Sequence, residues 1–161
     1  MLRLQRLNHA FLYVRDLDRA IAFYCDVLGM RVVARMGENM AFLQASASDN
    51  HHDLGLASVG AAAPIPEPGS TGLYHLAWEV GTIEEVAKAK DVLAAAEALL
   101  RTTDHGISKS VYGQDPDGNQ FEITWVVPRA SWEAGAANVA LSRPMNIERE
   151  IERFGQSNHL R

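Results

Sequence analysis

An internal repeat constrains the fold of this chain more than any other sequence feature. Residues 7–14 read LNHAFLYV and residues 73–80 read LYHLAWEV, so a histidine, His9 or His75, stands at the same place in each copy. Both segments are short and mostly apolar, as expected of strands that are buried on at least one face. The repeat therefore predicts two similar modules that each begin with a histidine-bearing strand.

A helix is predicted after each copy, because a capping residue is followed by apolar residues at helical spacing. Asp16 caps the first helix, and Gly29 ends it with the left-handed conformation that glycine adopts readily. Thr82 caps the second helix and forms a capping box with Glu85. The apolar pattern predicts that this second helix continues to near Arg101.

Three strands are predicted after the first helix, at residues 31–36, 40–45 and 52–58. In the second copy, residues 102–107 predict a strand only weakly. Residues 120–127 predict a strand clearly, because they follow DPDGN, a strong turn sequence. Each copy thus predicts a β-α-β-β-β module, and the chain is expected to be an α+β protein.

The two modules are predicted to form one domain over residues 1–127, with module one at about 4–60 and module two at about 71–127. Prolines and the loss of periodicity mark residues 61–70 as the linker between them. Residues 128–161 form a C-terminal extension.

The extension carries apolar groups that could dock on the body of the protein. Trp132 and Leu141 are two of them, and Ile147, Ile151 and Phe154 fit one face of a helix.

Composition excludes several classes of function. The 161 residues are 47% hydrophobic, enough for a sizeable core. A net charge of -5 argues against a nucleic-acid surface, which needs clustered basic residues. No apolar run approaches the roughly 18 residues of a membrane span, and no signal region is expected before the first strand. The predicted location is the cytoplasm, with no membrane or nucleic-acid partner.

The chain resembles the vicinal oxygen chelate superfamily, which contains glyoxalases, bleomycin resistance proteins and extradiol dioxygenases. The resemblance covers residues 4–127, and its marks are HHDL at 51–54, His75, DHG at 104–106 and YGQDPDGNQFE at 112–122. Within the superfamily the chain is most similar to single-domain type I extradiol dioxygenases, the catechol 2,3-dioxygenase kind. The resemblance implies two paired βαβββ modules that form a curled mixed-sheet half-barrel around a metal site.

The resemblance also implies a metal centre. In it, His9, His75 and Glu122 bind Fe(II) as a two-histidine, one-carboxylate facial triad, and Mn(II) could use the same ligands. Three protein ligands leave open positions for the two catechol oxygens and O2. The implied reaction inserts both atoms of O2 into a catechol-type diol and yields a product of the 2-hydroxymuconic semialdehyde type.

Three further residues match the pocket residues of that family. His52 corresponds to the histidine that accepts a catechol proton and assists oxygen activation, a role suited to a group that titrates near neutral pH. His105 and Tyr112 correspond to the residues that hydrogen-bond the substrate oxygens. His51 is expected to face away from His52 if both lie on the strand.

Two other functions stay open. A glyoxalase-like isomerase or epimerase would hold its metal with four protein ligands, and Asp53 is the candidate for the fourth. A drug-sequestering protein of the same fold would bind a small molecule without metal. Phe11, Phe42 and Trp78 could line an aromatic pocket or pack in the core, which is the more frequent place for such residues. The expected substrate is a catechol, a methylcatechol, a dihydroxybiphenyl or another vicinal diphenol. A homodimer or larger homo-oligomer is expected.

Overall fold

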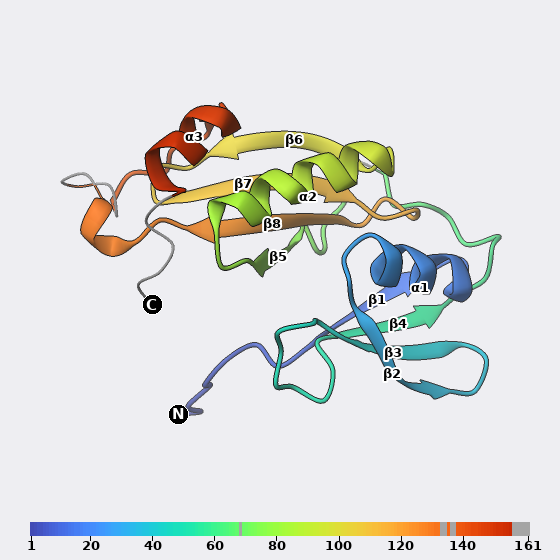
Figure 1. Ribbon diagram of the computed structural model, residues 1–161. Coiled ribbons are helices and arrows are strands. Elements are labelled where there is room, and N and C mark those ends of the chain that lie inside the picture. Colours follow the sequence, from blue (N-terminus) through green and yellow to red (C-terminus); the bar gives the residue numbers. More distant parts are fainter. Residues whose placement is uncertain (68, 133–134, 136–137, 156–161) are drawn as a thin grey trace. The chain divides into compact units, whose positions relative to one another are not determined.

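The computed structural model describes most of the chain, namely residues 1–67, 69–132, 135 and 138–155. The chain divides into two compact units (Figure 1). The first unit comprises residues 1–70 and 115–119, and the second comprises residues 71–114 and 120–161. No helix in the described part of the chain is long and apolar enough to cross a membrane.

The first unit is a four-stranded mixed sheet with one helix. The strand order is β1-β4-β3-β2, with β1 parallel to β4 and the other pairs antiparallel. Its elements are β1 (Ala10–Val14), α1 (Leu17–Asp26), β2 (Arg31–Met36), β3 (Met40–Gln44) and β4 (Leu54–Ser58). Side chains of β1 alternate between the two faces, so Leu12 and Val14 are buried while Phe11 and Tyr13 are exposed.

Local signals define α1 as predicted. The Asp16 carboxylate accepts a hydrogen bond from the Arg19 backbone N–H at 2.9 Å, which satisfies one free donor of the first turn. Gly29 follows the helix with a φ of +68°, in the left-handed region. The predicted strands at 31–36 and 40–45 are confirmed, and the third begins at Leu54 rather than at residue 52.

The second unit is a five-stranded mixed sheet. Its order is β5-β8-β7-β6-β9, with β5 parallel to β8 and the remaining pairs antiparallel. Its elements are β5 (Leu76–Glu79), α2 (Ile83–Ala95), β6 (Leu99–Asp104), β7 (Ser108–Gln114), β8 (Gln120–Val126), the short helix η1 (Arg129–Ser131), β9 (Arg143–Pro144) and α3 (Ile147–Phe154). Figure 1 shows α2 and α3 on the same side of this sheet.

The predicted end of the second helix is wrong. The capping box of Thr82 and Glu85 is present, but α2 ends at Ala95 and β6 already begins at Leu99. Glu97 breaks the helix with a φ of +54°, and it is the only non-glycine residue with a positive φ in the described ranges. The weakly predicted strand at 102–107 is therefore also misplaced.

Both units share one topology, which confirms the α+β class and the two βαβββ modules. The order β1-β4-β3-β2 is repeated as β5-β8-β7-β6, with β9 added at the edge. Each sheet is open rather than closed into a barrel. The half-barrel around a metal stays a prediction.

The described residues of the C-terminal extension pack on the second sheet. Ile147 and Phe154 of α3 are buried, which confirms the predicted apolar helix face. Phe154 packs on Trp125 of β8 with a ring-centroid distance of 5.2 Å. Trp132 donates a hydrogen bond from Nε1 to the Val127 carbonyl at 2.7 Å.

Candidate functional site

Strand pairing brings His75 and Glu122 together on one face of the second sheet. Glu122 on β8 stands opposite Ala77 on β5, and His75 precedes β5 on the same face as Ala77, two residues away. The His75 Nε2 and the Glu122 Oε2 are 3.1 Å apart. Glu122 is only 8% exposed, so this carboxylate is held in a mostly dry environment.

This pair fits the donor set of a divalent metal. Ligand atoms at about 2.1 Å from a metal, at right angles to one another, lie about 3.0 Å apart, close to the distance seen between His75 Nε2 and Glu122 Oε2. Imidazole and carboxylate are also the donor types that iron accepts. The Nδ1 of His75 is buried without a hydrogen-bond partner among the described residues, so no backbone group fixes this ring.

Tyr112 extends the same row of side chains across the sheet. It stands opposite Glu122 on β7, and Arg101 of β6 stands opposite Tyr112. The Arg101 guanidinium lies 3.8 Å from the centre of the tyrosine ring. Burial, and then the charge and hydrogen bonding of Glu122, raise the pKa of Tyr112 to about 12, against an opposing effect of Arg101. Tyr112 therefore keeps its proton at neutral pH.

His105 completes a continuous cluster in the second unit. It follows β6, and its Nε2 lies 3.0 Å from the Tyr112 hydroxyl. The Tyr112 ring in turn meets the His75 ring edge-on, with a centroid distance of 5.5 Å. The structure thus brings together four of the predicted site residues: His75, His105, Tyr112 and Glu122.

The other two predicted residues, His9 and His52, lie together in the first unit. Their ring centroids are 4.5 Å apart. The Nδ1 of His9 lies 2.8 Å from the Asn8 side-chain oxygen, an acceptor, so Nδ1 carries the proton and Nε2 keeps the lone pair that a metal requires. The predicted ligands are thus divided between the units. Within each unit taken by itself, the described residues contain no group of three His, Cys, Asp or Glu able to hold a metal.

His52 has an environment suited to proton transfer. Its Nε2 is buried without a hydrogen-bond partner in the described structure, and Phe42 packs edge-on against the ring at 5.1 Å. Burial, followed by the charges of His9 and His51, lowers the pKa of His52, although Asp53 opposes this shift. His52 is therefore biased toward the neutral form, which can accept a proton.

His51 does not face away from His52 in the way that strand alternation predicts. Both residues precede β4, and their Nδ1 atoms lie 3.1 Å apart. The alternation rule does not apply because these residues belong to a loop.

Asp53 is engaged in holding that loop. Its carboxylate accepts hydrogen bonds from the Ser48 hydroxyl at 2.7 Å, the Asn50 side-chain amide at 2.7 Å and the Ala45 backbone N–H at 2.9 Å. Burial alone would raise the pKa of Asp53, but these hydrogen bonds lower it. These contacts occupy both oxygens and give Asp53 a structural role.

The first unit also presents an aromatic surface. The Phe11 ring lies directly over Gly55, where an added Cβ would come within 2.2 Å of it, and Phe42 packs edge-on at 5.6 Å. Of the three aromatic residues predicted to line a pocket, Trp78 differs. It alternates with Ala77 and therefore lies on the face of β5 opposite to that of Ala77.

Two contacts of the site were missed by sequence reasoning. Arg101 was placed at the end of a helix, and only the β6–β7 pairing brings it to Tyr112. The main-chain carbonyl of Leu141 lies 2.7 Å from the Nδ1 of His105. A backbone carbonyl is present at every residue, so no sequence pattern could have identified this one.

Residues 6–123 match the sequence model of a protein family, the Glyoxalase/Bleomycin resistance protein/Dioxygenase superfamily. The chain is 29% identical over 151 residues to a catechol-2,3-dioxygenase of Bacillus subtilis (strain 168), which covers 92% of this chain and 52% of the relative. It is 31% identical over 123 residues to the metallothiol transferase FosB of Lysinibacillus sphaericus (strain C3-41), covering 74% of this chain and 81% of the relative. This chain thus spans about half the length of the dioxygenase.

Solved structures show the same fold. One is a lactoylglutathione lyase from Agrobacterium tumefaciens, with a TM-score of 0.58 and 28% identity, covering 76% of this chain and 95% of that one. The relatives therefore include both dioxygenases and enzymes with other chemistry.

Proposed function

The chain belongs to the Glyoxalase/Bleomycin resistance protein/Dioxygenase superfamily, and on that basis we propose that it is an Fe(II)-dependent extradiol dioxygenase. It would insert both atoms of O2 into a catechol-type diol and open the ring next to the diol. The observation that carries this proposal is the His75–Glu122 pair, whose donor atoms lie 3.1 Å apart on one sheet face beside Tyr112 and His105. The similarity to catechol-2,3-dioxygenase supports it.

His75 and Glu122 would supply two ligands of the metal, and His9 the third, as the resemblance to the extradiol enzymes predicts. When bound, Fe(II) supplies the redox chemistry that joins the diol and O2. Mn(II) accepts the same nitrogen and oxygen donors and is the alternative ion.

His52 is proposed as the group that takes a proton from the diol. Its buried Nε2 has no hydrogen-bond partner in the described structure, and its lowered pKa keeps that nitrogen free to accept a proton at neutral pH. A positioned acid or base of this kind contributes about 10²-fold or more to a rate.

Tyr112 and His105 are proposed to hydrogen-bond the oxygens of the substrate. Both groups are polar, mostly shielded from solvent and joined to one another at 3.0 Å, so their orientation is fixed before a ligand arrives. Phe11 and Phe42 offer an apolar aromatic surface against which the ring of the diol could pack.

A glyoxalase-like isomerase or epimerase is the second candidate function. The similarity to the lactoylglutathione lyase, of which the chain covers 95%, favours it. Such an enzyme needs a fourth protein ligand, and the predicted candidate, Asp53, uses its carboxylate in the loop before β4. Because these hydrogen bonds occupy the Asp53 carboxylate, they favour the three-ligand site of a dioxygenase over the four-ligand site of an isomerase.

The proposal is tested by loading the chain with Fe(II) without oxygen and measuring bound iron and turnover of catechol in three proteins. The unmodified chain should bind one iron and turn over catechol. Glu122→Ala should lose both iron and turnover, because a ligand is removed. Glu152→Ala, an exposed carboxylate on α3, is the matched control and should change neither. Normal iron retention by the Glu122 variant would contradict the proposed ligand set.

A further inference from the structure

His105 has a hydrogen-bond partner on each side of its ring, and the partner of Nδ1 determines its tautomer. The Nδ1 lies 2.7 Å from the Leu141 carbonyl oxygen, and the Nε2 lies 3.0 Å from the Tyr112 hydroxyl. A carbonyl oxygen only accepts, so Nδ1 must carry a proton. In the neutral ring Nε2 is then bare and can accept a hydrogen bond from the Tyr112 hydroxyl, whose single proton also has the Glu122 carboxylate as an acceptor.

We propose that the C-terminal extension positions His105 for catalysis through the main-chain carbonyl of Leu141. The carbonyl keeps the proton on Nδ1 and leaves Nε2 as the nitrogen that exchanges hydrogen bonds with Tyr112 and a bound ligand. In water the opposite tautomer, with the proton on Nε2, is the default for histidine. Without Leu141, Nε2 would therefore lose its acceptor role. The catalytic consequence rests on the proposed dioxygenase function, whereas the tautomer does not.

One carboxylate, that of Asp104, holds both partners of this contact in place. Its Oδ1 accepts hydrogen bonds from the Gly106 backbone N–H at 2.7 Å and from the Lys109 ammonium, which fixes the turn that carries His105. Its Oδ2 accepts from the Arg143 Nε at 2.8 Å, which fixes the extension two residues after Leu141. Asp104 is thus a positioning residue for the turn and the extension together.

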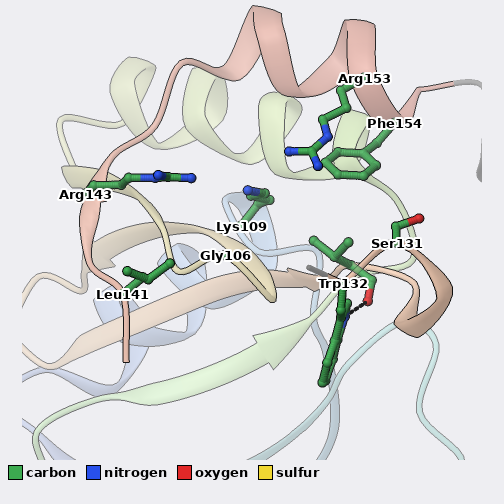
Figure 2. A pocket seen from close by; sticks show the side chains of 9 residues that line it. Gly106, Lys109, Ser131, Trp132, Leu141, Arg143, Arg153 and Phe154 are labelled. Carbon is green, nitrogen blue, oxygen red and sulfur yellow. Dashed lines mark hydrogen bonds between the residues drawn. The ribbon is translucent and has the colours of Figure 1, made fainter. Parts of the chain in front are cut away.

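The backbone of the extension supports the same placement. In β9, Arg143 pairs with Asp104 and Pro144 pairs with Thr103, so the preceding residues of the extension run beside the turn that follows β6. Figure 2 shows Leu141 beside Gly106, where an added Cβ would lie 3.0 Å from the leucine side chain. The turn and the extension are therefore in van der Waals contact.

Packing farther along the extension keeps it on the sheet. The side chains of Leu141, Trp132 and Phe154 line a pocket of about 110 Å³ (Figure 2). The Phe154 side chain is buried, and the Glu150 carboxylate lies 3.1 Å from the fully buried Lys109 ammonium. The described part of the extension therefore contacts the sheet both before and after β9, with Leu141 just before it.

The test is ¹⁵N NMR of the histidine rings in the full chain, kept free of iron so that no paramagnetic ion broadens the signals. A protonated and a bare ring nitrogen have clearly different chemical shifts. In the unmodified chain, neutral His105 should carry its proton on Nδ1. Tyr112→Phe should keep that tautomer, because Leu141 sets it.

Arg143→Ala removes the hydrogen bond to Asp104 and should move His105 toward the Nε2–H tautomer. If the extension stays in place in Arg143→Ala, the variant Arg143→Glu should displace the extension, because the new carboxylate repels that of Asp104. The backbone chemical shifts of Leu141 would report the displacement. Arg143→Lys should restore the Nδ1–H form. Arg149→Ala, an exposed arginine on α3, is the control and should leave it unchanged.

Turnover of catechol should respond in parallel. Arg143→Ala should lower kcat by about two- to tenfold, the range set by the net contribution of one hydrogen bond, with little change in KM. An Nε2–H tautomer in the unmodified chain, or displacement of Leu141 without a change in tautomer, would overturn the inference. If the tautomer behaves as expected but no catechol is consumed, the positioning stands and the proposed function fails.

Discussion

Lys109→Met should destabilise the protein far more than loss of an ordinary surface lysine. The Lys109 side chain is 1% exposed and contacts Asp104 and Glu150, whose side chains are 7% and 9% exposed. Removing the ammonium leaves Glu150 without this cation in a site nearly closed to water. Breaking a buried ion pair from one side costs about 3–5 kcal/mol. For a protein of this size that corresponds to a fall in Tm of roughly 6–20 °C.

The chain offers a matched control for this prediction. Lys90 also pairs with a glutamate of α3, because its ammonium lies 3.9 Å from Glu148, but the two side chains are 35% and 74% exposed. Exposed pairs contribute about 0–1 kcal/mol. Urea unfolding of Lys109→Met and Lys90→Met should therefore differ by several kcal/mol in free energy of unfolding. Equal losses would refute the claim that the buried cluster holds the extension.

A second variant separates the lost pair from lost packing. Adding Glu150→Gln to Lys109→Met removes the stranded charge, so the double variant should be more stable than Lys109→Met alone. A double variant that is less stable by the full sum of both changes would show that charge is not the cause.

Three further predictions concern other parts of the structure. Burial alone would raise the pKa of Asp104, but hydrogen bonds from Lys109, Gly106 and Arg143 lower it to about 2 from an ordinary 3.8. The ionised carboxylate should therefore add about 2 kcal/mol to the free energy of unfolding above pH 4. This contribution should be lost as pH falls toward 2, which unfolding measured across that pH range would show. In Asp104→Asn, the free energy of unfolding should depend less on pH between 4 and 2. Gly55→Ala places a Cβ 2.2 Å from the Phe11 ring and should cost about 1–3 kcal/mol, which thermal unfolding would measure and Phe11→Ala in the same chain should partly relieve. His52→Ala should keep its iron while turnover falls by about 10²-fold or more, and near-normal turnover would assign the proton transfer elsewhere.

The sequence was sufficient to predict those parts of the fold that depend on local patterns. The repeated strand, the caps at Asp16 and Thr82 and the turn before Gln120 follow from short-range preferences, and the structure contains each of them. The end of α2 could not be found this way. Residues 98–100 read Ala-Leu-Leu, which suits a helix or a strand equally, and the positive φ of Glu97 decides between them.

The candidate site was predictable only where it depends on side-chain chemistry. His75 and Glu122 are identified by residue type, and strand alternation then places them on one face. The expectation for His51 assumed that it lies on the strand with His52, but both residues lie in the loop before β4, where strand alternation does not apply. The contact between His105 and Leu141 was not predictable, because it involves a backbone atom of a distant segment.

The most direct test of the proposed function is the ratio of O2 consumed to catechol consumed by the iron-loaded chain, followed together with the yellow ring-fission product. The account predicts one O2 for each catechol, with yellow product formed at the same rate. Catechol oxidised without a yellow product would contradict extradiol cleavage. An iron-loaded chain inert to catechol and its substituted forms would contradict it too and would favour the isomerase.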